Sequence, residues 1–150
     1  MSSVTLDTTI LAKAIVPPRR RKQDSIYKEQ FRLHSIAKSI TRKVETGQDV
    51  MNIPSVTIVE IAAVAARLTG KEERGIQASD YVKEHGNIIY DIYLLDEAVR
   101  IAAATKISGF DSIFITCAKL SDSALITDDK KMYESAVKQG IKAKLLRDME

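Results

Sequence analysis

At 150 residues, the chain is long enough to bury a hydrophobic core without disulfides or metal ions to hold it together. Its 45% hydrophobic and 29% charged residues are typical of a globular protein and exclude an intrinsically disordered one. The formal net charge of +3 is too small to predict nucleic-acid binding by itself. The only cysteine, Cys117, cannot form an internal disulfide, and no apolar run approaches the roughly 18 residues of a membrane span. We therefore expect a cytoplasmic protein with no membrane segment and a single domain over residues 1–150.

The first half of the chain alternates short apolar runs with longer amphipathic ones. Residues 3–6 are typical of a strand, and a short helix over 9–15 is expected to end at the following proline pair, because proline lacks the amide hydrogen that a helix interior needs. Apolar residues three and four positions apart then predict a long amphipathic helix over 26–46. A second strand is predicted at 50–53, and a further helix at 57–70.

The second half repeats this alternation. In chain order we predict a helix over 75–84, a strand over 87–92, helices over 94–106 and 110–120, a strand over 124–127, a helix over 129–140 and a strand over 142–146. Strands separated by helices need crossover connections, and such connections join parallel strands. The sequence therefore predicts an α/β fold with a mainly parallel sheet flanked by helices.

Acidic residues stand at the junctions where an apolar strand gives way to a helix. Asp7 follows the first strand, Glu60 lies in the first turns after the second, and Asp128 and Asp129 follow the fourth. Asp111 lies at the start of the helix that precedes this fourth strand. In a parallel sheet such junctions share one edge, the carboxyl ends of the strands, where ligands of open α/β sheets bind.

Each acid also has a simpler explanation as a helix cap, because carboxylates accept hydrogen bonds from the free amides of a helix start and complement its dipole. Asp7 would cap the first helix, and either Asp128 or Asp129 would cap the last one. The pairs Thr57–Glu60 and Ser108–Asp111 have the spacing of a capping box. The last junction nevertheless has one acid more than a cap needs.

Carboxylates that converge within about 4 Å repel by about 4 kcal/mol per pair at an effective dielectric constant of about 20. Such a cluster needs either protonation of some members or a bound cation. Hard carboxylate oxygens without a cysteine–histidine set favour Mg²⁺ or Mn²⁺ over zinc, and the two histidines, His34 and His85, show no ligand spacing. A divalent ion held in this way points first to phosphodiester hydrolysis.

One cluster of positive charge follows the proline pair and consists of Arg19, Arg20, Arg21 and Lys22. It is either a solvated loop or a loop that grips phosphates or an acidic partner. Lys130 and Lys131, at the start of the last helix, have the same two interpretations. With no tryptophan and few other aromatic residues, the chain offers little for base stacking, which argues against sequence-specific base readout.

Four blocks of the sequence resemble the signature blocks of PIN-domain nucleases, and the VapC-type and archaeal members most closely. In chain order the blocks are VTLDTTIL, IPSVTIVEIAAV, GFDSIFITCAKL and LITDDKKMYE, and the resemblance covers residues 4–146. The segment between the first two blocks, which holds the basic loop and the helix over 26–46, is longer than in compact members of that family.

The resemblance implies a three-layer α/β/α fold and a Mg²⁺- or Mn²⁺-dependent endoribonuclease. The implied catalytic and metal-binding residues are Asp7, Glu60, Asp111 and Asp129. The implied supporting residues are Thr127, which would orient an acid or a water, and Asp128, as a cap or as a neighbour of the metal ligands. The implied partners are an RNA substrate, a second copy of the chain and, if the protein is a toxin, a small antitoxin protein. A stand-alone RNA-processing nuclease is the other role within the family.

Two functions of other classes stay open at this stage. The first is a metal- and RNA-binding scaffold of the same fold without hydrolysis, which would bind RNA regardless of a chelator. The second is a phosphoacceptor signalling domain, because that is also a parallel α/β fold with an acidic Mg²⁺ pocket. Such domains carry an acid pair after the first strand, whereas here Asp7 stands alone before Thr8 and Thr9.

Overall fold

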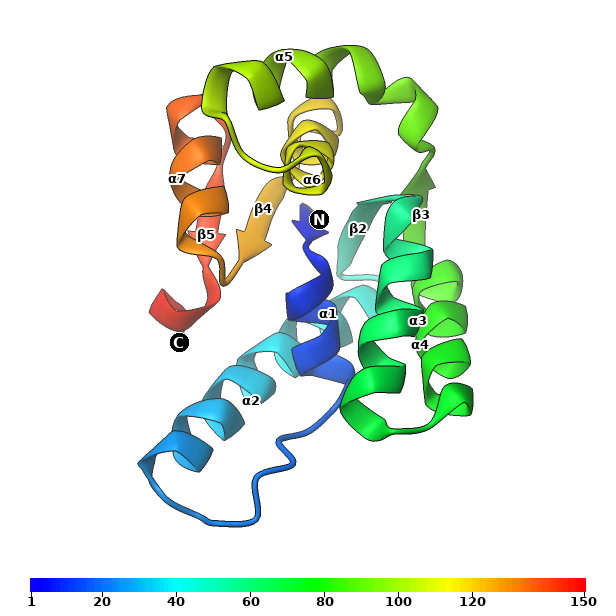
Figure 1. Cartoon of the computed structure of the whole chain (residues 1–150), viewed down its shortest axis with the longest axis vertical. Coiled ribbons are helices and arrows are strands. Elements are labelled where there is room, and N and C mark those ends of the chain that lie inside the picture. The colour runs from blue at the N-terminus through cyan, green and yellow to red at the C-terminus, as the bar shows by residue number, and fades with distance from the viewer.

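The computed structural model describes all 150 residues, with one five-stranded sheet between layers of helices (Figure 1). The strands are β1 (Ser2–Leu6), β2 (Asp49–Pro54), β3 (Gly86–Ile89), β4 (Ala124–Thr127) and β5 (Ala143–Leu145). Their order in the sheet is β3-β2-β1-β4-β5, and every neighbouring pair is parallel. The predicted parallel α/β sheet is therefore confirmed.

Seven α-helices and two short 3₁₀ turns connect the strands. They are α1 (Thr8–Ile15), α2 (Ser25–Glu45), α3 (Val56–Thr69), α4 (Glu72–His85), η1 (Asp91–Tyr93), α5 (Leu95–Thr105), α6 (Gly109–Leu120), α7 (Lys130–Lys138) and η2 (Leu146–Asp148). Two predicted strands were too long: β3 ends at Ile89 and β5 at Leu145, and a 3₁₀ turn follows each closely. Ile89 pairs with Pro54 and Leu145 with Thr127, the last residues of the neighbouring strands, so neither strand has a ladder to continue on.

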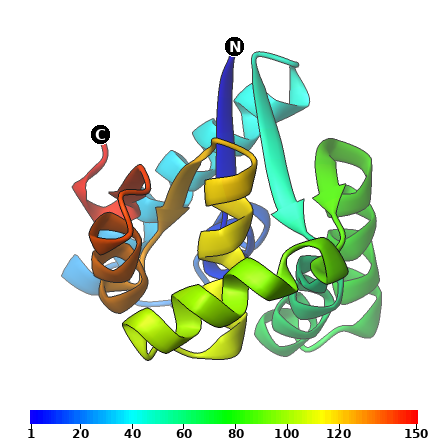
Figure 2. The same ribbon diagram turned by 90° about the horizontal axis from the view of Figure 1, so that it is seen from above.

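Helices cover both faces of the sheet, which gives the three-layer α/β/α arrangement that the resemblance implies. On one face α6 packs against β1, β2 and β4, with α5 outside it, and α1 and α2 lie on the other face (Figure 2). α3 and α4 pack against each other beside β2 and β3 (Figure 1). No single helix is both long and apolar enough to cross a membrane, and α5 and α6 meet that test only as a joined pair bent by 117°.

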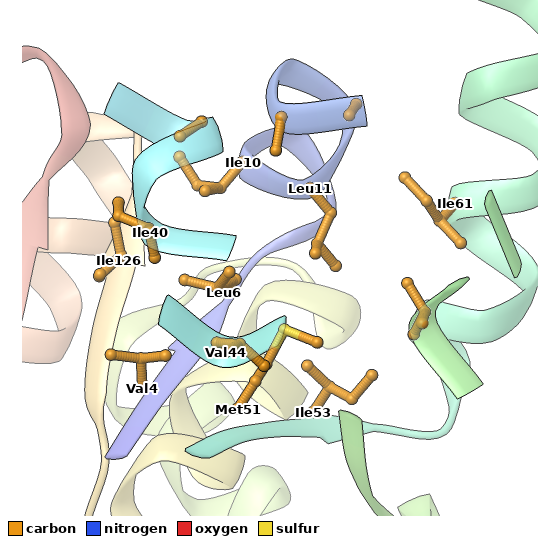
Figure 3. Close-up of a cluster of buried hydrophobic side chains, with 14 of the residues drawn as sticks. Val4, Leu6, Ile10, Leu11, Ile40, Val44, Met51, Ile53, Ile61 and Ile126 are labelled. Carbon is orange, nitrogen blue, oxygen red and sulfur yellow. The ribbon is translucent and has the colours of Figure 1, made fainter. Parts of the chain in front are cut away.

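The alternation of side chains along each strand divides the core in two. Val4 and Leu6 of β1 point into the larger cluster, where they meet Ile40 and Val44 of α2 (Figure 3). Thr5, between them, lies on the opposite face against the Cys117 thiol of α6. A second, smaller cluster, which includes Phe114, Ile115 and Leu125, lies between α6 and β4. Full burial of a large aliphatic side chain contributes about 1.5–3 kcal/mol, so these two clusters hold the helices on the sheet.

Gly75 shows how closely α3 and α4 approach. The sequence predicted a helix that starts at this position, but the structure has Gly75 buried inside α4, which begins at Glu72. A Cβ atom at Gly75 would lie 2.4 Å from the carbonyl oxygen of Ala62 and 3.1 Å from the Cβ of Ala66. The glycine is therefore a helix–helix contact, and it sets the position of α3.

Candidate active site

The four acids predicted at the edge of the sheet lie on four different elements. Asp7 joins β1 to α1, Asp129 joins β4 to α7, and Asp111 is in the first turn of α6. Glu60 lies on the second turn of α3. Contacts place them around one edge of the sheet, because Thr127 joins Asp7 to Asp129, Asp111 shares a cleft with Asp129, and Glu60 accepts a hydrogen bond from Thr8, the residue after Asp7.

Asp7 is the buried centre of this group, with 3% of its surface exposed. Its Oδ1 accepts hydrogen bonds from the Oγ1 of Thr9 at 2.7 Å and from the backbone N–H of Ile10 at 3.0 Å, and its Oδ2 accepts one from the hydroxyl of Thr127. Burial nevertheless raises the pKa of Asp7, because these hydrogen bonds and the positive charge of Lys13 offset only part of the lost hydration.

Glu60 is half-buried and tied to the start of α1. Its Oε1 accepts a hydrogen bond from the Oγ1 of Thr8 at 2.9 Å. Burial raises the pKa of Glu60, and the nearby negative charges of Asp111 and Asp7 raise it further. The sequence-predicted capping box Thr57–Glu60 was wrong: α3 begins at Val56, so Thr57 lies inside the helix, where its buried hydroxyl has no hydrogen-bond partner.

Asp111 and Asp129 face a common cleft. The cleft has a volume of about 490 Å³ and lies between the α5–α6 loop and α7. Ser108 caps α6 by accepting from the backbone N–H of Asp111 at 3.2 Å, which confirms this half of the second predicted capping box. Burial raises the pKa of Asp111, and repulsion by the carboxylate of Asp129 adds to this effect.

The two adjacent aspartates after β4 have different surroundings. Asp129 is the helix cap, because its Oδ1 accepts from the backbone N–H of Met132 at 3.0 Å. Asp128 instead pairs with Arg147 at 3.0 Å and with Lys13 at 3.7 Å. Asp128 was expected as a cap or as a neighbour of the metal ligands, and its role as a cap was wrong, since only the residue directly before α7 can reach the free amide three positions on.

Thr127 links the two acidic junctions. Its buried hydroxyl donates to the Oδ2 of Asp7 and accepts from the backbone N–H of Asp129 at 3.0 Å. β1 and β4 are neighbouring parallel strands whose register brings the end of one beside the end of the other. Thr127 thus fixes one Asp7 oxygen and the backbone of Asp129 at the same time.

Three further residues belong to this region and were not singled out from the sequence. Asp91, in η1, is a fifth acid that raises the pKa of Glu60, and its Oδ1 accepts from the Oγ of Ser55 at 2.9 Å. Lys13 and Arg147 are the cations that flank Asp128. The predicted strand over 87–92 included Asp91, so the sequence did not indicate that Asp91 follows the end of the third strand. No local pattern marks Lys13 or Arg147.

The donors fit a hard divalent ion by type, although they do not form a closed coordination shell. No three acidic, histidine or cysteine side chains converge closely enough to hold an ion by themselves. Mg²⁺ typically keeps several of its waters and binds through one or two carboxylates, so a spread of acids around it suits its chemistry. Cysteine and histidine are absent from this group, which argues against a zinc site.

The predicted basic loop lies at the other end of α1 from Asp7 (Figure 1). Since α1 has eight residues, the two are separated by roughly 12 Å along the helix axis. Arg20 is held by Asp24 through two hydrogen bonds of 3.0 and 2.6 Å. Arg19 and Arg20 line a groove of about 640 Å³ that runs past Lys13 to Thr9, so the groove connects the loop to the start of α1.

Solved structures with a similar fold cover nearly the whole chain. VapBC2 from Rickettsia felis, bound to a DNA fragment from its promoter, has a TM-score of 0.60 at 15% identity over 95% of this chain and 98% of that one. FitAcB from Neisseria gonorrhoeae has a TM-score of 0.56 at 12% identity, over 97% and 99% of the two chains. A domain of a functionally unknown protein from Methanocaldococcus jannaschii has a TM-score of 0.51 at 20% identity, over 100% and 94%.

These similarities show the fold alone, since all the identities are low. A sequence search of curated proteins finds no match. The profile of the PIN domain, however, matches residues 4–138, a span that includes all four acids of the edge group. The chain therefore belongs to the PIN-domain family.

Proposed function

We propose that this protein is an endoribonuclease that uses Mg²⁺ or Mn²⁺ and cuts RNA phosphodiester bonds at Asp7, Glu60, Asp111 and Asp129, with the whole chain acting as one catalytic domain. The observation that carries the proposal is the gathering of these four acids, from four elements, around one edge of the sheet. Membership of the PIN-domain family supports it, because PIN domains are generally nucleases.

The raised pKa values of three of the acids fit such a site. Desolvation disfavours the charged forms of Asp7, Glu60 and Asp111, and repulsion by neighbouring acids adds to this effect for Glu60 and Asp111. A cation at the edge would reverse this by favouring the charged forms. When bound there, Mg²⁺ or Mn²⁺ would supply Lewis acidity, which makes water a better nucleophile and offsets charge on the phosphate.

The chain's own residues would orient this chemistry. Thr127 and Thr9 hold the Asp7 carboxylate in one orientation, and Thr8 does the same for Glu60. The Oδ1 of Asp129 accepts the hydrogen bond that caps α7, and its Oδ2 would face the cleft that Asp129 shares with Asp111. Asp128, as a supporting residue, would steady the β4–α7 loop through its ion pairs with Arg147 and Lys13.

Positive charge along α1 would hold the RNA on one side of the acids. Lys13, Arg19 and Arg20 line the groove that leads from Thr9 to the basic loop. Arg21 and Lys22 of this loop are exposed and available to phosphates, whereas Arg20 is engaged by Asp24. Contacts of this kind position a nucleic acid without reading its sequence.

The test is cleavage of an end-labelled mixed RNA by the purified protein with Mg²⁺, with Mn²⁺ and with EDTA. Asp111→Asn keeps the size of the side chain and removes its charge, so it should abolish cleavage and leave the fold intact. Asp122→Asn is the matched control, because Asp122 is an exposed aspartate near the opposite ends of the strands. Cleavage by Asp111→Asn at the wild-type rate would show that the site is wrongly assigned. Chelator-insensitive RNA binding by a folded protein that never cuts would favour the non-catalytic scaffold.

The groove along α1 also suits a protein partner, and we propose a small antitoxin as its occupant. Apolar side chains of three helices, among them Leu33, Val64 and Leu68, line this groove, and basic side chains border it. The structural similarity to VapBC2 supports a toxin with a partner. Expression of the chain alone should then stop cell growth, and Asp111→Asn should relieve the arrest. Normal growth with an active enzyme would favour an RNA-processing role.

We further propose that the protein forms a homodimer through a patch on η1, α5 and the start of α6. The patch consists of Tyr90, Ile92, Tyr93, Leu95, Val99 and Phe110, all exposed. Leu95 and Val99 are four residues apart on α5, so they lie on the same face of that helix. Several large apolar side chains exposed on neighbouring elements favour a protein–protein contact.

A further inference from the structure

A second surface with several lysines lies on the side of the acids away from the α1 groove. It is the cleft of about 490 Å³ between the α5–α6 loop and α7. Two of the edge acids and three lysines line it: Asp111, Asp129, Lys106, Lys131 and Lys138. The cleft therefore begins at the proposed reaction site and continues along α7 between positive charges.

The three lysines of this cleft form no ion pair within the folded protein. None of them has an acidic partner within 4.0 Å, although eight other ion pairs occur in the molecule. Glu134 lines the same cleft and pairs with none of them. The cleft has as many carboxylates as lysines, so its positive charge is local, at three ammonium groups that have no ion-pair partner. Such unpaired ammonium groups favour contacts with the phosphates of an anionic ligand.

Two of these lysines stand at positions where lysine is unfavourable for the fold. Lys106 ends α5 with φ of +62°, a left-handed conformation that glycine adopts at lower cost. Lys131 is in the first turn of α7, where the helix dipole disfavours positive charge and where the cap, Asp129, is the only acidic residue. Lysines retained against local stability point to a role outside folding.

The side chains that line the cleft limit the chemical class of ligand that it can bind. Ile107 is its only hydrophobic lining residue, and no aromatic side chain lines it, so it offers neither an apolar floor nor a stacking platform. Recognition there would come from charge and from hydroxyl groups such as those of Ser108 and Thr105. A phosphodiester backbone needs only those contacts.

We propose that this cleft binds the backbone of single-stranded RNA beside the scissile phosphate, with Lys106, Lys131 and Lys138 contacting successive phosphates. The proposal rests on the nuclease function proposed above and adds a substrate path that does not depend on the basic loop. The strand would cross the acids between the α1 groove on one side and the α7 cleft on the other.

The test compares two triple variants by fluorescence anisotropy with labelled oligo(U) over a series of salt concentrations, in EDTA so that no cutting occurs. The cleft variant carries Lys106→Gln, Lys131→Gln and Lys138→Gln. The control variant changes Lys43, Lys142 and Lys144 to Gln, three lysines that line another opening around the amino ends of the strands. Both variants lose three positive charges, so they differ only in where the charge was.

The cleft variant should bind about tenfold or more weakly at low salt, and the slope of log affinity against log salt should fall by about 2, since each phosphate contact contributes about 0.7 for a single strand. The control variant should keep the wild-type slope. Lys106→Gly alone should raise or preserve Tm while weakening binding, because glycine relieves the left-handed backbone and removes the charge. Loss of binding in a protein that is at least as stable as wild type excludes misfolding as the cause.

Equal slopes for the cleft variant, the control variant and wild type would overturn the proposal. If wild type still cuts RNA in that case, the nuclease function stands and only the path is wrong. If wild type never cuts but the cleft variant alone loses binding, the path stands and the nuclease function falls. A larger effect of the substitutions on duplex RNA than on oligo(U) would overturn the single-strand assignment.

Discussion

Asp7 shows how one side chain serves both the fold and the candidate site. Its Oδ1 caps α1 through the backbone N–H of Ile10, and its Oδ2 is held by Thr127. The capping explanation and the functional one are therefore not alternatives here. The same holds for Asp129, which caps α7 through one oxygen and faces the cleft near Asp111.

The raised pKa values of the acids predict how stability depends on pH. A carboxyl group whose pKa is higher in the folded protein than in the unfolded chain costs stability as pH rises through the interval between the two values. Burial and the negative charge of Asp129 both raise the pKa of Asp111. In EDTA, the Tm advantage of Asp111→Asn over wild type should be small near pH about 4 and should grow toward pH about 7.

Thermal unfolding followed by circular dichroism over that pH range measures this difference. Adding Mg²⁺ or Mn²⁺ at neutral pH should raise the Tm of wild type more than that of the variant, because a bound ion stabilises the folded state. A variant that is less stable than wild type at neutral pH in EDTA would contradict the prediction.

Thr127 should matter for stability and for activity. Thr127→Val keeps the shape of the side chain but leaves an Asp7 oxygen and the backbone N–H of Asp129 without a partner. Unsatisfied buried groups cost about 1–3 kcal/mol, and loss of the oriented Asp7 carboxylate should lower cleavage about tenfold or more. Urea unfolding and RNA cleavage measure the two effects. Thr127→Ser is the control, since its hydroxyl should restore most of both, and failure to do so would point to a packing effect.

At the scale of elements, the position of α3 depends on how closely α4 approaches it. α3 carries Glu60, and the backbone N–H of Val56 in its first turn donates to the Oδ1 of Asp91 in η1 at 3.3 Å. Gly75 allows the contact with Ala62 and Ala66 on the other side. Glu60 thus reaches the edge of the sheet because α3 is fixed at both places.

Gly75→Ala should therefore destabilise the protein. The added methyl group would lie 2.4 Å from the carbonyl oxygen of Ala62, which belongs to the backbone and cannot move without shifting α3. Overpacking of this kind costs about 1–3 kcal/mol. Urea unfolding measures the loss. Gly109→Ala is the matched control, because a Cβ at Gly109 meets nothing within 4 Å and alanine is a better helix residue, so this variant should be no less stable than wild type.

At the scale of the whole molecule, the exposed apolar patch adjoins the acidic edge, because Phe110 precedes Asp111 and Asp91 lies between Tyr90 and Ile92. The acids, the α1 groove and the α7 cleft lie around the carboxyl ends of the strands, and the exposed apolar patch lies on η1, α5 and the start of α6. A partner bound to this patch would extend the surface around the site and would leave α7 free for substrate.

The proposed dimer gives a prediction at this scale. Val99→Glu places a charge on a side chain of the patch that is 67% exposed, so it should convert the dimer to a monomer without unfolding the chain. Light scattering after size exclusion measures the mass. Val137→Glu, on the outer side of α7 and away from the patch, is the matched control and should leave the dimer intact. A wild-type protein that is monomeric at all concentrations would remove the basis of this proposal.

Local chemistry was enough to predict much of this molecule. The alternation of strands and helices, the parallel sheet and the acids at Asp7, Asp111 and Asp129 follow from patterns of a few residues, because periodicity, capping and strand ends are local properties. The family resemblance likewise rests on four short blocks, and the match over residues 4–138 bears it out.

Other features depend on contacts between residues far apart in the chain, and only the tertiary structure decided them. The ends of β3 and β5 are set by the lengths of β2 and β4. Asp128 pairs with Arg147 and Lys13, which are far from it in the chain, so the sequence could not predict these ion pairs. The cleft of Lys106, Lys131 and Lys138 forms only where a loop and a helix meet. Such contacts carry no sequence period, because their partners are brought together by packing and not by spacing along the chain.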